Sequence, residues 1–229
     1  YDTAMSFDIN DLDMPDLVHN PMYMKLPPDV VRFYQELHRD SIIEELDVYA
    51  VHGGVRSNKK RQVASGAVYD MRGELVKLHN AKAERLKQII DELQGRPVMV
   101  FFEFIHDYAA ICDTLKRQVP ALYGSTKERD VVNIVREWNA GNIPVLALHP
   151  RSAAYGLNMQ DSGNVMVWYT CPWSYELLNQ GIARLWRNGQ RNKVIVHYLI
   201  VEGTEDERVY NRCAIEKADV HKEVMEGLL

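Results

Sequence analysis

Hydrophobic positions change their spacing along the chain, and the spacing predicts which segments are strands and which are helices. From residue 79 onward, short apolar runs alternate with segments of helical period. The runs predict strands at 98–102, 121–123, 145–149, 165–169 and 194–201. The periodic segments predict helices at 81–93, 106–118, 127–139, 174–186 and 205–225. This alternation indicates βαβ units, so we predict an α/β fold with a mostly parallel sheet and helices on both faces, in three layers.

The first 78 residues follow a different pattern. Four prolines interrupt residues 1–28, where only Met22–Leu26 has the character of a short strand. A helical period begins at Asp29 and still includes Ile42 and Leu46, and a Gly-Gly break follows at 52–55. A shorter helix is predicted at 58–65 and a hairpin around residues 70–73. We therefore predict a linker and helical region at 1–78 and one domain at 79–229.

Composition narrows the class of protein. The chain has 229 residues, of which 46% are hydrophobic and 26% charged, as in an ordinary globular domain with an appendage. We find no apolar run long enough for a membrane span and no secretory signal, and the three cysteines have no metal-binding spacing. We therefore expect a cytoplasmic, reducing location, no membrane partner and no metal ligands in this chain. Because the first residue is tyrosine, we expect a longer parent protein.

Charge is unevenly distributed. The net charge is −5, which argues against a strongly nucleic-acid-binding surface overall. Residues 51–96, however, carry 10 basic and 5 acidic side chains. The cluster from Arg56 to Arg61 therefore has two interpretations: contact with a DNA backbone, or a solvated helix face.

The segment Gln180–Gln190, QGIARLWRNGQ, carries the most specific chemistry. Arg184 and Arg187 are three residues apart, so on a helix both guanidinium groups leave the same face. Each planar guanidinium can form two hydrogen bonds to phosphate oxygens. The spacing therefore predicts a site for a polyphosphate.

This segment resembles the last motif of superfamily 2 helicases of the Swi/Snf type, Q-x₃-R-x₂-R-x-G-Q, in all five fixed letters. Other segments resemble motifs of the same family in the same order. These are PVMVFFEF at 97–104, YGSTKER at 123–129, HPRSAAYGLNM at 149–159 and the tryptophan Trp173. The resemblance covers about residues 20–226 and is closest to compact phage and bacterial members. It implies the C-terminal RecA-like lobe of an ATP-dependent DNA helicase or translocase.

The resemblance also implies roles for individual residues. Arg187 matches the arginine finger, Arg184 would assist it, and Gln180 would order the interface. In the motif V segment, Gly156 and Asn158 would couple the nucleotide to the nucleic acid. The DNA is expected to be double-stranded, and the residues expected near it are Ser125, Thr126, Ser152 and Trp173. Ser125 or Thr126 would also cap the following helix.

The chain lacks the phosphate loop G-x-x-x-x-G-K-[ST] and an acidic box. The ligands of ATP-bound Mg²⁺ are therefore expected on a missing N-terminal RecA-like lobe, and this chain alone is expected to be inactive as an ATPase. Two alternatives stay open. One is the lobe of an RNA helicase, and the other is a catalytically silent RecA-like scaffold that binds nucleic acid or protein.

Overall fold

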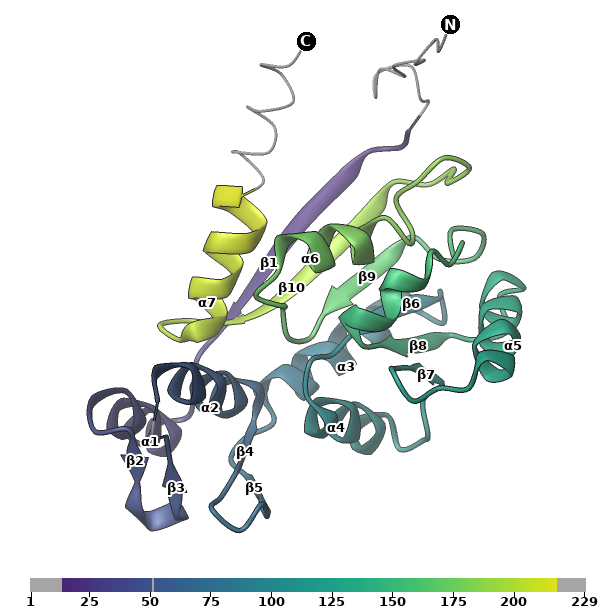
Figure 1. Cartoon of the computed structure of the whole chain (residues 1–229). Helices are drawn as coiled ribbons and strands as arrows, with labels where there is room; N and C mark the ends of the chain where they lie inside the picture. Colours follow the sequence, from purple (N-terminus) through teal and green to yellow (C-terminus); the bar gives the residue numbers. More distant parts are fainter. Residues whose placement is uncertain (1–13, 51, 218–229) are drawn as a thin grey trace, which may run out of the picture.

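The computed structural model describes residues 14–50 and 52–217, with only the backbone of residues 153–155 (Figure 1). Its centre is a six-stranded sheet in the order β1-β10-β9-β6-β8-β7, and every neighbouring pair is parallel. The strands are β1 (Leu17–Met24), β6 (Val98–Phe101), β7 (Ala121–Leu122), β8 (Val145–Leu148), β9 (Val165–Trp168) and β10 (Val194–Val201). The five strands predicted after residue 79 are all present.

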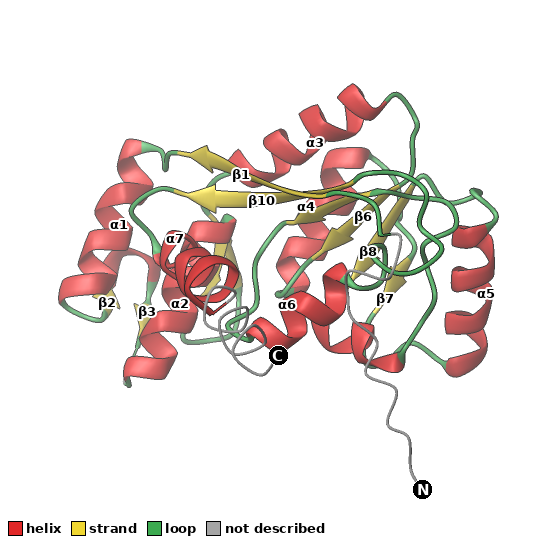
Figure 2. Ribbon diagram, turned by 90° about the horizontal axis from the view of Figure 1, so that it is seen from above, coloured by secondary structure: helices red, strands yellow, loops and turns green. Residues whose placement is uncertain are grey.

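Helices cover both faces of this sheet. The helices α3 (Ala81–Leu93) and α4 (Ile105–Leu115) pack on one face. On the other lie α5 (Glu128–Asn139), α6 (Tyr175–Ile182) and α7 (Glu205–Tyr210). Figure 2 shows α3 on one side of the strands and α6 and α7 on the other. Successive residues of a strand point to opposite faces, so β6 sends Met99 and Phe101 to the α5–α7 side and Val98 and Val100 to the α3–α4 side. The three-layer prediction is confirmed.

Strand β1 comes from the predicted linker region and yet forms an edge of the sheet. It pairs with β10 over its whole length and contains Pro21 opposite Tyr198. An edge strand tolerates proline, because the missing N–H can face away from the ladder. The predicted strand Met22–Leu26 was therefore too short and displaced. The sheet therefore combines β1, which precedes residue 79, with five strands that follow this residue. The division of the chain into two domains at residue 79 stays a prediction.

The remaining N-terminal elements form a small subdomain with its own apolar core. They are α1 (Pro28–Arg39), β2 (Ile42–Ile43), the 3₁₀ turn η2 (Glu44–Leu46), β3 (Val48–Tyr49), α2 (Gly53–Ser65), β4 (Ala67–Tyr69) and β5 (Leu75–Lys77). The hairpin β4–β5 confirms the prediction around residues 70–73. The placement of Ile42 and Leu46 on the first helix was wrong, because Asp40 N–H bonds Glu36 O and Ser41 then adopts φ 63°. The predicted break at the two glycines was also wrong, since both lie in the first turn of α2, which begins at Gly53.

Two further helix predictions need correction. Helix α6 ends at Ile182 rather than Trp186. Helix α7 begins as predicted, with the Thr204 hydroxyl accepting from Asp206 N–H, but passes into a π-helical turn, η4 (Asn211–Glu216). The remainder of the predicted helix, 218–225, lies outside the described residues. None of the helices in the described part of the chain has the length and apolar character needed to cross a bilayer.

Candidate nucleotide and nucleic-acid sites

The arginine segment leaves the helix before it reaches its arginines. Helix α6 is capped by the Ser174 hydroxyl, which accepts from Leu177 N–H at 3.2 Å. After Ile182 the chain tightens, and Arg184 N–H bonds Gly181 O. The Gln180 carbonyl that an α-helix would offer to that amide instead accepts from Arg184 Nε at 2.9 Å. The prediction that both arginines lie on one helix was therefore wrong, although Gln180 itself lies exposed near the end of α6.

The two arginines have opposite environments. Arg184 is 8% exposed, and its Nη1 donates to Leu157 O at 3.0 Å. Burial, and secondly the positive charge of Arg187, lower the pKa of Arg184 from its ordinary value. The side chain of Arg187 is partly exposed and has no hydrogen bond or ion pair with any residue that the structure describes. One arginine is therefore committed within the fold, and the other is available.

The loop that precedes β9 is held by side chains. Four consecutive carbonyl groups, those of residues 157–160, each accept a hydrogen bond from a side chain. Leu157 O accepts from Arg184 Nη1 (3.0 Å), Asn158 O from Asn139 Nδ2 (2.9 Å), Met159 O from Trp138 Nε1 (2.8 Å) and Gln160 O from Gln190 Nε2 (3.1 Å). Sequence reasoning missed Trp138 and Asn139, whose only signal was their place at the end of a predicted helix. The loop has a fixed backbone without being a helix or a strand.

The predicted motif V residues lie beside this loop. Gly156 ends the 3₁₀ helix η3 (Pro150–Tyr155) with φ 66°, a conformation that favours glycine. Asn158 is exposed, so its side-chain amide faces solvent, while its backbone carbonyl accepts the hydrogen bond from Asn139. Ser152 in η3 is 3% exposed, and its hydroxyl has no hydrogen-bond partner among the described residues. Since η3 packs on α6, the structure brings motif V and the arginine segment together.

Ser125 and Thr126 lie in the turn between β7 and α5. Neither caps α5, whose N-cap is Lys127 without a side-chain hydrogen bond, so that part of the prediction was wrong. The Thr126 hydroxyl instead accepts from Tyr123 N–H at 3.0 Å and closes the turn. Ser125 is exposed. Of the two hydroxyl groups, that of Ser125 is the accessible one.

Trp173 lies between β9 and α6 and is partly buried against the α5–α7 side of the core. The Arg208 guanidinium lies 5.7 Å from the centre of its ring, within range of a cation–π contact. Its carbonyl accepts from Cys213 Sγ. The ring therefore already has a cationic neighbour from α7.

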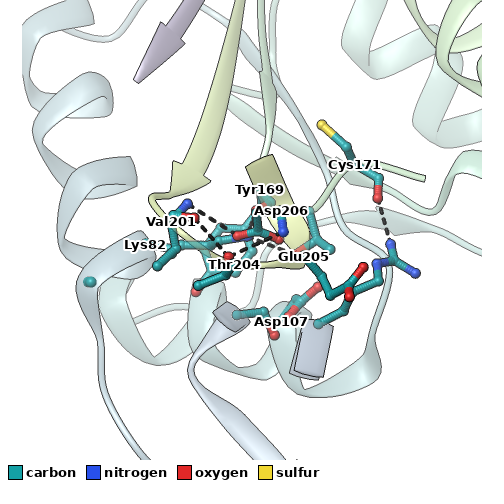
Figure 3. A network of polar contacts seen from close by, with 12 residues as sticks. Lys82, Asp107, Tyr169, Cys171, Val201, Thr204, Glu205 and Asp206 are labelled. Atoms are coloured by element: carbon teal, nitrogen blue, oxygen red, sulfur yellow. Dashed lines mark hydrogen bonds and ion pairs between the residues drawn. The ribbon is translucent and has the colours of Figure 1, made fainter. Parts of the chain in front are cut away.

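Two members of the basic cluster on α2, Lys60 and Arg61, match neither of its two interpretations. Lys60 is 8% exposed and pairs with Glu205 at 2.8 Å, and Arg61 is 4% exposed and donates to Cys171 O at 2.5 Å (Figure 3). Lys59 donates to the carbonyl of Tyr69. A longer ion pair of 3.8 Å joins Arg61 to Glu103, whose pKa is raised by burial in spite of the arginine. Lys60 and Arg61 fasten α2 to the carboxyl ends of β6 and β9 and to the start of α7.

A third buried cation, Lys82, completes this network. Lys82 is fully buried, forms an ion pair of 2.7 Å with Asp206 and donates to Tyr169 O at 2.8 Å (Figure 3). Burying a charge is tolerated only when it is paired and hydrogen-bonded, and Lys82 satisfies both conditions. Sequence reasoning had no signal for this pair, because the two residues are far apart along the chain.

The predicted residues therefore fall into two places. Ser125, Thr126 and Trp173 follow the carboxyl ends of β7 and β9, at the edge where parallel sheets bind ligands. The arginine segment is fastened near the other end of β9, since Gln190 Nε2 bonds Gly163 O at 3.0 Å. The 3₁₀ helix η3 connects these two places, because it begins at the carboxyl end of β8 and packs on α6. Nothing in the described residues forms a cluster of three or more metal-ligating side chains.

Comparisons with known proteins agree with this architecture. The helicase conserved C-terminal domain family matches residues 81–189. The putative protein p41 of Acyrthosiphon pisum secondary endosymbiont phage 1 is 31% identical over 221 residues, which are 92% of this chain and 46% of that protein. The chromatin-remodeling ATPase INO80 of Saccharomyces cerevisiae is 30% identical over 154 residues, 65% of this chain and 10% of that protein. The chain thus spans about half of the first relative and a tenth of the second.

A solved structure has the same fold. The Sulfolobus solfataricus SWI2/SNF2 ATPase core in complex with dsDNA superposes with a TM-score of 0.64 at 23% identity, over 89% of this chain and 45% of that one. The parallel sheet, the order of the sequence motifs and the family match all indicate the same kind of domain. Residues 81–189 belong to the helicase conserved C-terminal domain family, and the chain has the RecA-like fold of the C-terminal lobe of Swi2/Snf2 ATPases.

Proposed function

We propose that this chain is the C-terminal lobe of an ATP-dependent DNA helicase or translocase and that Arg187 is its arginine finger. The observation that carries the proposal is an arginine side chain without a partner among the described residues, next to a second, buried guanidinium. Neither has a carboxylate counter-ion among the described residues. Two adjacent cations of this kind favour a polyanion, and a triphosphate fits the planar geometry of a guanidinium.

The chain contributes charge and position to the reaction. Bound ATP with Mg²⁺ supplies the γ-phosphoryl group, and the phosphate loop and metal ligands belong to an N-terminal lobe in the same protein. Arg187 donates hydrogen bonds to γ-phosphate oxygens, where negative charge grows in the transition state. Gln180, exposed near the end of α6, orders the interface between the lobes. The chain alone does not hydrolyse ATP.

Double-stranded DNA is the proposed track. The related Sulfolobus core was solved with dsDNA, which supports the same ligand for this lobe. The Ser125 hydroxyl and the backbone amides around Thr126 contact one phosphate, and the helix η3, which carries the buried Ser152, lies near another. Trp173 packs against the DNA at the same edge, and Gly156 and Asn158 transmit the nucleotide state to it. The protein acts in the cytoplasm of a bacterial or phage-infected cell.

The experiment is an ATPase assay with and without double-stranded DNA. It compares this chain alone with a protein that also contains the N-terminal lobe. Turnover by the longer protein only, stimulated by DNA, supports the proposal. Turnover by the isolated chain contradicts it, and so does an inert longer protein, which would favour a scaffold that binds DNA or protein without catalysis.

A further inference from the structure

The segment that carries Arg187 is fastened to the loop 157–160 at both of its ends. Arg184 lies three residues before Arg187 and bonds Leu157 O, and Gln190 lies three residues after it and bonds Gln160 O. We propose that Arg184 and Gln190 are positioning residues that hold Arg187 and the loop 157–160 as one unit. The effect of this fastening on catalysis rests on the proposed function, whereas the fastening itself rests only on the hydrogen bonds.

Both fastening side chains are buried and their polar atoms are used. Gln190 is 6% exposed, and its Nε2 also donates to Gly163 O at 3.0 Å. Its Oε1 accepts from the amides of Arg191 and Asn192, each at 3.0 Å. A glutamine with both ends satisfied holds a single orientation, and the positive φ of Gly189, 96°, lets the chain turn into it.

Arg184 is similarly committed. Its Nε bonds Gln180 O and its Nη1 bonds Leu157 O, so two of its three nitrogens point at protein carbonyl groups. A bidentate grip on a phosphate needs two nitrogens of one edge free. Arg187 has its whole guanidinium free of hydrogen bonds from the described residues. The structure therefore divides the pair: Arg187 reaches the nucleotide, and Arg184 determines where Arg187 is.

The fastening has a mechanical consequence. The loop 157–160 follows directly on η3, which carries Ser152, and η3 packs on α6. A displacement of the arginine segment must therefore move the loop, unless hydrogen bonds to buried groups break. Misplacing a catalytic group by about 1 Å can cost on the order of 10²-fold in rate. Through these two side chains, the arginine position and the DNA-facing helix η3 change together.

The first test is hydrogen exchange on the nucleotide-free chain. Arg184→Lys keeps the charge but lacks the planar fork that spans two carbonyl groups. It should speed exchange of the hydrogen-bonded amides of Leu185, Trp186 and Gln190, and of the Trp138 indole N–H that bonds Met159 O in the loop, at least about tenfold, because the local structure opens more often. Amides of β10 should stay as slow as in the parent, which shows that the fold is intact. Gln190→Met tests the other end, and Arg191→Lys, an exposed arginine beside it, is the matched control.

The second test is steady-state ATP hydrolysis by the protein that contains both lobes. A positioning role predicts that Arg184→Lys and Gln190→Met lower kcat at least about tenfold and change KM for ATP less than threefold, while Arg191→Lys changes neither. Arg184→Ala, which also removes the charge, should lower kcat no further than Arg184→Lys, because the loss that matters is that of the two carbonyl contacts, and both variants share it.

The outcomes separate the two proposals. Unchanged exchange in both segments overturns the fastening, and so does full kcat with Arg184→Lys. Lost kcat with unchanged exchange also overturns it, since Arg184 would then act on the nucleotide directly. If Arg187→Ala retains turnover, the finger assignment fails, but the exchange data still decide whether Arg184 and Gln190 fasten the loop.

Discussion

Two basic clusters in this chain look alike in sequence and differ completely in the fold. Lys60 and Arg61 on α2 are buried, and each has an acceptor on the main domain, Glu205 and Cys171 O respectively. In the arginine segment, Arg184 is buried against carbonyl groups and Arg187 has no partner in the described residues. The first cluster joins two parts of the molecule, whereas the second leaves a cation available for a ligand.

A basic residue is therefore informative about function when the fold leaves it without a counter-charge. The cations of α2 satisfy carboxylates and carbonyl groups that would otherwise be buried alone, which is a structural role. An unpaired guanidinium gains nothing comparable from the fold, so its retention next to another cation favours a ligand as its partner.

The largest effect is expected at Arg187. In the two-lobe protein, Arg187→Ala should lower kcat about 10³-fold or more, because the γ-phosphate loses its stabilising charge. Nucleotide affinity should change only a few fold, and the free energy of unfolding should stay within about 0.5 kcal/mol, since no hydrogen bond in the described residues is lost. Rapid-quench hydrolysis, nucleotide titration and urea unfolding measure the three quantities. A large loss of stability would place Arg187 with the structural cations of α2.

The opposite result is expected at Lys82. Lys82→Met leaves the Asp206 carboxylate buried without its cation and should lower the free energy of unfolding by about 3–5 kcal/mol. Lys87→Met is the control, because Lys87 pairs with Asp91 at 2.6 Å but both side chains are more than half exposed. That pair should contribute at most about 1 kcal/mol. Equal urea midpoints for the two variants would contradict the structural role of the network.

Sequence reasoning succeeded where the signal is local. The strands of the sheet were predicted because buried parallel strands are continuous apolar runs, and α3 was predicted to the residue at Ala81–Leu93. Edge strand β1 was incompletely predicted, since Pro21 is acceptable only at an edge, and the sequence does not say which strand is the edge. The carbonyl contacts of Trp138, Asn139 and Gln190 and the ion pair Lys82–Asp206 depend on distant segments meeting. No period or spacing along the chain encodes them.

Packing of α6 supplies a third test. A methyl group at Gly181 would lie 2.7 Å and 2.8 Å from two ring carbons of Trp168, so the helix approaches the sheet closely there. Gly181→Ala should cost about 1–3 kcal/mol from overpacking, partly offset by about 1 kcal/mol of helix propensity. Gly54→Ala on α2 is the matched control, with open space around it, and should be neutral or stabilising. A neutral Gly181→Ala variant in urea unfolding would show that the arginine segment does not depend on this contact.

The smallest effect is expected at Glu103, the weakest partner in the α2 network. Burial raises its pKa above the ordinary value in the folded protein, with Arg61 only partly opposing the shift. Between the unfolded and folded pKa values the native state binds more protons, so this group lowers stability as the pH rises through that window. Glu103→Gln removes that cost and should leave the free energy of unfolding at pH 7 unchanged or up to about 1 kcal/mol higher. The difference between variant and parent should shrink as the pH falls below the raised pKa.

Urea unfolding of both proteins from pH 4.5 to 7.5 measures this difference in the free energy of unfolding. The contributions of the buried histidines cancel, because both proteins contain them. A variant that is several kcal/mol less stable at pH 7 would mean that Arg61 needs the carboxylate as Lys82 needs Asp206, and that every cation of the network is held by charge.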